Sequence, residues 1–197
     1  MKEYEYMLNR YIYILLLTLI FFACKKENGF RGIEDKFFEY QEMGWKSNSF
    51  TYFINGINYT ATEVPLEYYL LKNESGSKID SIYKLHHRER IIEFEFQQEE
   101  KKDLLLEKYT NKDYKKSVEY LSFTIKNDFQ VITCNTKDTI TCSGVLFERN
   151  YKIAPFKRLL LYFYGVEPDD TIKLLYDDQL FGNGLIKFNF SKRPVKL

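Results

Sequence analysis

The chain has 197 residues and an almost balanced charge, with 29 Lys and Arg against 28 Asp and Glu and a formal net charge of +1. This length is typical of one domain with one sizeable core, and the balanced charge argues against a nucleic-acid binder, which would carry a basic excess on one face. The 17 Tyr and 17 Phe residues favour β-structure, because aromatic side chains suit pleated, half-buried surfaces.

An apolar run near the N-terminus predicts an export signal. It covers residues 11–23, and its length of about 13 residues is too short for a membrane-spanning helix but typical of the apolar stretch of a secretory signal. Arg10 supplies the positive charge that is expected before such a run. Because the first residues are acidic for a signal, Met7 is an alternative start to Met1.

Cys24 follows this run directly, after the small residue Ala23. The pattern resembles the lipobox of bacterial lipoproteins, and Phe21 and Phe22 before it resemble lipoproteins of the Bacteroidota. The resemblance implies that the Cys24 thiol receives a diacylglyceryl group, that a signal peptidase cuts before it, and that the new N-terminus is acylated, for example with palmitate. An uncleaved signal anchor with a chance cysteine is the alternative.

The same resemblance also predicts how the chain is divided and where in the cell it is located. It implies a signal peptide at residues 1–23 and a lipidated Cys24, whereas the lack of periodicity after it predicts a tether at 24–35 and the strand signals below predict a single β-rich domain at 36–197. Each buried methylene contributes about 0.8 kcal/mol, so several acyl chains together hold a protein firmly on a membrane. Lipoproteins of this group end in the outer membrane, so we expect a lipid-anchored position there, facing the periplasm or the cell surface.

The clearest strand signal is a hairpin. Asn55 and Gly56 separate two apolar runs and supply the positive φ angles of a tight two-residue turn. Alternation of apolar and polar residues predicts strands with one buried face at 91–96, 121–125 and 186–190. Further strands are expected at 80–83, 159–164 and 171–176.

Two segments, 35–43 and 97–108, are predicted to be helical, and the second is alternatively a long charged hairpin tip. Many short strands with turns between them indicate a mainly β fold. We therefore predict an antiparallel β-sandwich or barrel-like domain with one or two short helices.

Cys134 and Cys142 flank a polar segment between two β-type runs, which predicts a further hairpin. A turn centred near Asp138 would place the two cysteines opposite each other, close enough for a disulfide. A bridge over so short a loop would stabilise the fold by about 2–3 kcal/mol. Two buried thiols are the alternative, and metal binding is not expected, because no histidine lies near either cysteine.

The sequence contains no recognisable catalytic or metal-binding set, so we expect no metal and no cofactor. His86 and His87 are the only histidines, and on a strand they would point to opposite faces, which favours a structural or surface role. The acidic pairs 169–170 and 177–178 flank a predicted strand, so they would lie too far apart to share a calcium ion. Turn residues are the better interpretation.

The tripeptide Asp-Ser/Thr-Ile occurs three times. It resembles the O-glycosylation acceptor motif of exported Bacteroidota proteins, which implies Ser81, Thr139 and Thr171 as acceptors. The alternative is that each aspartate ends a turn and each β-branched residue begins a strand.

These observations favour a non-enzymatic, lipid-anchored interaction module of the cell envelope, with the membrane and either another envelope protein or a glycan as partners and no nucleic acid. One alternative is a carbohydrate or small-ligand binder that uses exposed aromatic rings as stacking platforms. Another is a periplasmic immunity or inhibitor protein. An enzyme would require a cleft that gathers His86 or His87 with carboxylates.

Overall fold

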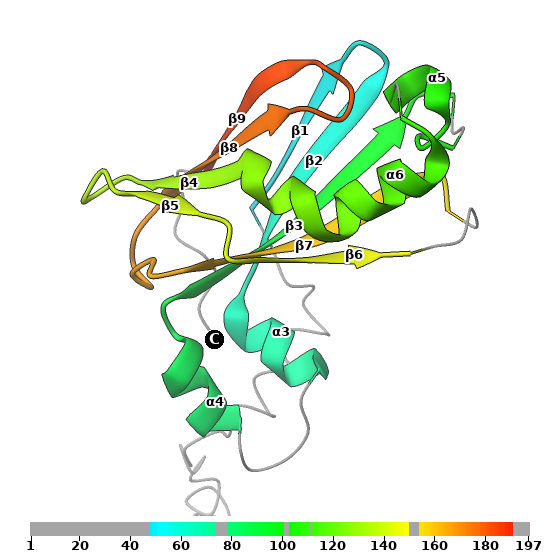
Figure 1. The fold of residues 1–197 in the computed structure, drawn as a ribbon. Coiled ribbons are helices and arrows are strands. Elements are labelled where there is room, and N and C mark those ends of the chain that lie inside the picture. Colours follow the sequence, from blue (N-terminus) through cyan, green and yellow to red (C-terminus); the bar gives the residue numbers. More distant parts are fainter. Residues whose placement is uncertain (1–47, 74–78, 101–102, 111, 150–153, 191–197) are drawn as a thin grey trace, which may run out of the picture.

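The computed structural model describes residues 48–73, 79–100, 103–110, 112–149 and 154–190. Two antiparallel sheets form the framework of this part of the chain, which confirms the prediction of a mainly β, sandwich-like fold (Figure 1). The predictions for Cys24, the tether and a helix at 35–43 lie outside the described residues.

The larger sheet has five strands in the order β1-β2-β3-β7-β6. All neighbouring strands in it are antiparallel. The predicted hairpin is confirmed: β1 and β2 are joined by a two-residue turn, in which Asn55 and Gly56 have φ angles of 48° and 80°. The strands are β1 (Ser49–Ile54), β2 (Ile57–Val64), β3 (Glu89–Gln98), β7 (Phe156–Tyr164) and β6 (Gly144–Glu148).

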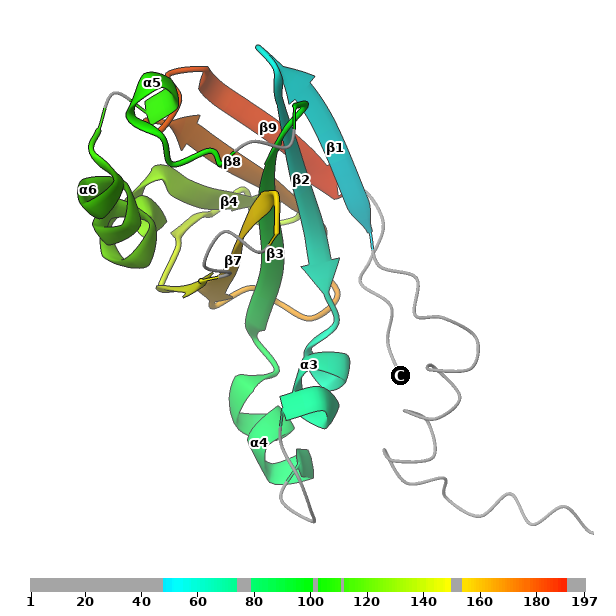
Figure 2. The same ribbon diagram turned by 90° about the vertical axis from the view of Figure 1, so that its right-hand side faces the viewer.

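The smaller sheet has four antiparallel strands in the order β5-β4-β8-β9. It lies against one face of the five-stranded sheet (Figure 2). Its strands are β4 (Phe129–Thr133), β5 (Thr139–Thr141), β8 (Ile172–Asp178) and β9 (Gly184–Phe190). The strands predicted at 91–96, 159–164, 171–176 and 186–190 are thus confirmed as parts of β3, β7, β8 and β9.

Aromatic and aliphatic side chains from both sheets fill most of the space between them. Phe94 from β3 lies in contact with Phe129 from β4, with ring centroids 4.9 Å apart, and Phe129 stacks on Tyr176 from β8 at 4.4 Å. All three side chains are fully buried. Burial of such large rings is the main source of stability, at about 1.5–3 kcal/mol for each side chain.

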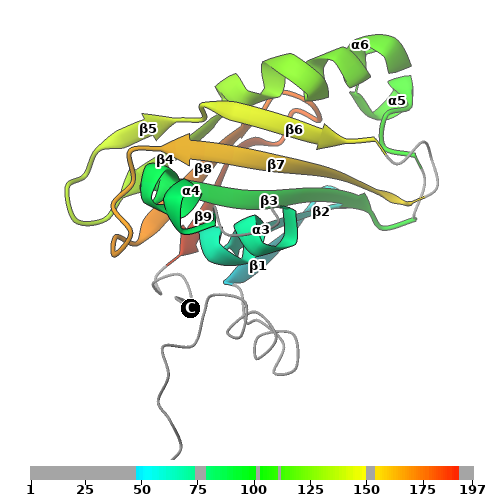
Figure 3. The ribbon, with the colours of Figure 1, turned by 90° about the horizontal axis from the view of Figure 1, so that it is seen from below.

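Six short helical segments accompany the sheets within the described ranges. α3 (Leu66–Asn73) and α4 (Ile79–His86) cover one end of the outer face of the five-stranded sheet, the face turned away from the smaller sheet (Figure 3). There Leu70 and Ile79 pack with Ile91 of β3 in a second hydrophobic cluster. The others are α5 (Glu107–Thr110), α6 (Tyr114–Glu119), η1 (Tyr120–Thr124) and η2 (Ile125–Asp128).

Two strand predictions are wrong, and both segments are helical. Residues 80–83 lie in α4, where Ile79, Ile82 and Tyr83 pack into the second cluster at helical spacing. Residues 121–125 lie in η1 and η2, where Leu121 and Ile125 are buried four positions apart. A spacing of four suits a helix face as well as a strand face, so alternation over five residues did not separate the two.

The helix predicted over 97–108 is also wrong. β3 continues through Gln98, a turn follows at Glu99 and Glu100, and only α5 at the end of the segment is helical. Leu104 and Leu105 are buried against the main core in a turn that precedes α5, not in a helix. Burial of these side chains against the sandwich outweighs the helix propensity of the segment.

Candidate functional site

Two rows of side chains cross the outer face of the five-stranded sheet, one of them polar and the other half polar and half apolar. The registers place Thr60, Glu95, Arg158 and Glu148 in one row across β2, β3, β7 and β6. A neighbouring row runs through Thr62, Glu93, Leu160 and Leu146. Cross-strand neighbours on one face lie close enough to interact directly.

Arg158 is the centre of this face. Its guanidinium lies 3.4 Å from Glu93 Oε1, 3.2 Å from Glu95 Oε2 and 3.5 Å from Glu148 Oε2. Only the contact with Glu95 has the geometry of a hydrogen bond, and Arg158 Nε is a buried donor with no hydrogen-bond partner. The arginine also lies over the ring of Phe156, 4.8 Å from its centroid. Arg158 is therefore fixed in place but has unused hydrogen-bonding capacity.

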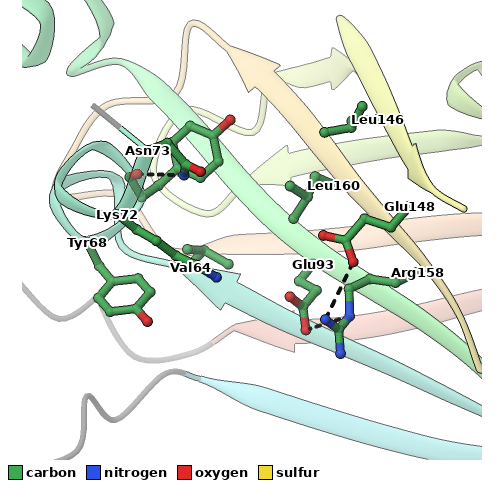
Figure 4. A pocket seen from close by; sticks show the side chains of 10 residues that line it. Val64, Tyr68, Lys72, Asn73, Glu93, Leu146, Glu148, Arg158 and Leu160 are labelled. Atoms are coloured by element: carbon green, nitrogen blue, oxygen red, sulfur yellow. Dashed lines mark hydrogen bonds and ion pairs between the residues drawn. The ribbon is translucent and has the colours of Figure 1, made fainter. Parts of the chain in front are cut away.

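A groove opens beside this cluster, between α3 and the strands β3, β7 and β6 (Figure 4). Its volume is about 200 Å³. Figure 4 shows Tyr68, Lys72 and Asn73 on the α3 side and Glu148 and Arg158 on the strand side. The groove thus combines aromatic, aliphatic and charged side chains from elements that are distant in the sequence.

The α3 wall of the groove is held by its own hydrogen bonds. Tyr69 shares a hydrogen bond of 2.9 Å with the hydroxyl of Tyr162 on β7, and the two rings meet edge to face at 6.2 Å. Asn73 Nδ2 donates to the backbone carbonyl of Tyr69 at 2.7 Å. Burial and the hydrogen bond to Tyr69 raise the pKa of Tyr162, so the hydroxyl of Tyr162 stays protonated at neutral pH. The wall is a built surface rather than a loose helix end.

The electrostatics of the groove are close to neutral. Among its lining residues, the carboxylates of Glu93 and Glu148 are matched by the cations of Lys72 and Arg158. Burial raises the pKa of Glu93, Arg158 opposes that rise, and the nearby carboxylates of Glu148 and Glu95 add to it. Glu93 therefore binds its proton more tightly than a carboxyl group in water does.

The two histidines lie elsewhere. His86 ends α4 and His87 follows it, so the strand assumed for them is absent. His86 Nδ1 lies 3.1 Å from Glu89 Oε2, and His87 Nδ1 lies 2.7 Å from the carbonyl oxygen of Lys84. Both are exposed and neither lines the groove.

The acidic pairs lie at opposite ends of β8, as expected for turn residues. One member of the second pair has a larger role than predicted: the carboxylate of Asp178 is buried and accepts hydrogen bonds from Tyr59, Tyr176 and three backbone N–H groups. Within the described residues, no three histidine, cysteine, aspartate or glutamate side chains are arranged to hold a metal ion.

A second buried polar group closes the opposite end of the sandwich. Arg90 of β3 donates to the backbone carbonyls of Glu167, Pro168 and Asp170 at 2.8–2.9 Å. It also pairs with the buried carboxylate of Glu63 at 3.3 Å. The arginine therefore ties β2, β3 and the loop before β8 together.

The prediction that Cys134 and Cys142 lie opposite each other in a hairpin is wrong, and both are free thiols in the structure. The hairpin exists, but β4 and β5 pair Val131 with Ile140, so the turn is centred nearer to Cys134 than predicted. Cys142 then lies beside Phe129 and donates its N–H to that carbonyl at 3.2 Å, whereas Cys134 donates to the carbonyl of Thr171 at 2.8 Å. Because the register of β4 and β5 differs from the predicted one, the two cysteines do not lie opposite each other.

The candidate acceptors of O-glycosylation lie in three different settings. Ser81 is exposed on α4, Thr139 is exposed at the start of β5, and Thr171 is half-buried just before β8. The turn-then-strand interpretation suits Thr139 and Thr171 but not the helical Ser81. All three lie outside the groove.

Sequence reasoning missed the groove and Arg158. The alternation of Glu93 and Glu95 with buried residues indicated one strand of the groove, but its partner strands β6 and β7 follow β3 only after more than forty further residues. Comparison of the chain with protein-family models, with curated proteins and with solved structures finds no match. In the described part of the chain, no helix combines the length and apolar character that crossing a bilayer requires.

Proposed function

We propose that this protein is a non-enzymatic, lipid-anchored binding module of the bacterial cell envelope. In this proposal Cys24 carries the anchor, and the sandwich presents the outer face of its five-stranded sheet to a ligand or partner. The groove between α3 and β6 is the observation that carries the binding role.

The groove supports binding because its walls are already formed. Arg158 and its three carboxylates, and the Tyr69–Tyr162 pair, hold the polar groups in place before any ligand arrives. Preorganisation of this kind lowers the entropic cost of association. The exposed Leu146 and the ring of Tyr68 add apolar area beside the charges.

The anchor is supported by the sequence alone. A thiol that follows an apolar run and a small residue is the substrate that lipoprotein processing requires, and lipid on Cys24 would hold the domain at a membrane surface. The outer membrane is the proposed location.

The anchor is tested by labelling cells with a palmitate analogue. We expect wild type to incorporate the label and to fractionate with membranes, and the Cys24→Ser variant to lose the label. Globomycin should cause an unprocessed precursor to accumulate. Unchanged processing, or firm membrane attachment of the Cys24→Ser variant, would overturn the proposed address.

The binding role is tested by co-purification from gently solubilised membranes. The variant Glu148→Ala removes an exposed carboxylate of the groove, and Glu119→Ala on α6 is the matched control away from it. We expect a partner or glycan to be retained by wild type and the control and lost from Glu148→Ala. Equal retention by all three, or an empty wild type, would contradict a binding role of this face.

A further inference from the structure

Resting on the proposed binding role, we propose that the groove binds one ring of a neutral oligosaccharide. In this assignment, vicinal hydroxyl groups bridge Arg158 and the carboxylates beside it. The C–H face of the sugar ring packs on Tyr68 and Leu146. The site is a binding subsite, and no bond is made or broken in it.

The charge of the groove selects a neutral ligand. Two carboxylates and two cationic groups line it, so a phosphate, a uronate or an amine would meet repulsion as well as attraction. A ligand without charge avoids this conflict and still makes charge-assisted hydrogen bonds to the ionised groups.

Unused hydrogen-bonding groups select a ligand rich in hydroxyls. The contacts of Arg158 with Glu93 and Glu148, at 3.4 and 3.5 Å, are ion pairs without the geometry of a hydrogen bond, so these two carboxylates can still accept hydrogen bonds from a ligand. A hydroxyl group is both donor and acceptor, so neighbouring hydroxyls can accept from the guanidinium and donate to either carboxylate. An ester or ammonium group satisfies only one side of this arrangement, and an apolar group satisfies neither.

Apolar surface faces the same space. Leu146 is 51% exposed at the rim, and Tyr68 and Leu160 line the groove beneath and opposite it (Figure 4). A sugar ring has an apolar C–H face and a polar edge, which matches a site where rings and alkyl groups lie beside carboxylates. The half-buried ring of Tyr68 provides such contact area at a low entropic cost.

The size of the groove limits the ligand to one ring at a time. Its volume of about 200 Å³ is below the roughly 300–1,000 Å³ of pockets that hold drug-sized ligands. A peptide helix or a folded partner would not enter it. Further sugar units would therefore lie along the exposed threonine row of β1 and β2, where Thr51 and Thr60 share a hydrogen bond of 2.9 Å.

The test uses the full chain in detergent micelles. Neutral tri- to hexasaccharides of glucose, mannose, galactose and xylose are screened on an array, and the best is titrated by calorimetry against wild type. We expect a dissociation constant below about 1 mM that changes less than threefold when NaCl rises from about 0.05 to 0.5 M, because no ligand charge is screened. Binding that weakens more than tenfold with salt, or a uronate analogue that binds more tightly, would overturn the neutral assignment.

Single-residue variants test whether the sugar binds in the groove. Glu148→Ala and Tyr68→Ala should each weaken binding at least tenfold, whereas Glu119→Ala and Tyr164→Ala, on α6 and at the exposed end of β7, should leave it unchanged. Urea denaturation of each variant separates lost binding from lost folding. Sugar binding that survives both groove variants overturns this site. Absence of any sugar binding overturns the assignment of the ligand. If a protein partner binds wild type and is lost from Glu148→Ala, the proposed binding role of the groove stands although the sugar assignment fails.

Discussion

Asp178 shows how much a single side chain can organise. Its two oxygens accept five hydrogen bonds, from the hydroxyls of Tyr59 and Tyr176 and from the backbone N–H groups of Leu180, Phe181 and Asn183. No lysine or arginine shares in these contacts, so hydrogen bonds alone compensate the carboxylate for its burial. The charge holds the β8–β9 turn against β2 of the other sheet.

Replacement of Asp178 by alanine should therefore lower the free energy of unfolding by about 3–5 kcal/mol, because buried donors are left without partners. The neighbouring Asp177 is exposed, and Asp177→Ala should change stability by less than about 0.5 kcal/mol. Urea denaturation of both variants measures the difference. Similar midpoints for the two would show that Asp178 is an ordinary turn residue.

The segment α6–η1–η2 shows at the scale of an element why local alternation misled the strand prediction. Leu121 and Ile125 are fully buried, whereas Phe123, halfway between them, is 70% exposed. On a strand all three side chains would share one face. The helical backbone turns Phe123 away from the core and leaves it on the surface.

This difference is directly measurable. Leu121→Ala should cost about 2–4 kcal/mol through lost burial and a residual cavity, and Phe123→Ala should change stability by less than about 0.5 kcal/mol. Thermal or urea denaturation of the two variants gives both values. Comparable losses for both would support the strand and contradict the helix.

Arg90 connects elements at the other end of the sandwich, and its ion pair makes stability depend on pH. Burial raises the pKa of Glu63, although Arg90 opposes the rise. Without the arginine, Glu63 would be a buried, unpaired carboxylate, so Arg90→Met should cost about 3–5 kcal/mol at neutral pH. In the double variant with Glu63→Gln, part of this loss should be recovered, because the unpaired charge is gone.

The direction of the pH dependence follows from the raised pKa. A carboxyl that binds its proton more tightly in the folded state stabilises the fold below its unfolded pKa, and this contribution is lost as the pH rises through the folded pKa. The Arg90→Met variant should therefore become more stable, relative to wild type, as the pH falls from 7 toward 5. A constant difference across this range would show that Glu63 is not the group responsible.

At the scale of the whole molecule, local signals predicted the sandwich but not its site. The Asn55-Gly56 turn and the alternation in β3 and β9 were readable because each is set by neighbouring residues. The groove depends on pairing between Glu95 and Arg158, which are 63 positions apart, and on helix α3 docking beside them. Register between distant strands is fixed by the packing of the entire core, which no short pattern records.

Strand register also explains why the disulfide prediction failed. The predicted bridge required Cys134 to pair with Cys142, and packing of the core fixes a different register between β4 and β5. With both thiols free and a core built from large buried rings, the domain should not need a disulfide for stability. We expect the free energy of unfolding of oxidised and dithiothreitol-treated protein to agree within about 0.5 kcal/mol, and thiol labelling in denaturant to detect both Cys134 and Cys142. A loss of about 2–3 kcal/mol on reduction, the amount that a bridge across so short a loop would supply, would mean that the hairpin adopts a different register from the one that β4 and β5 show.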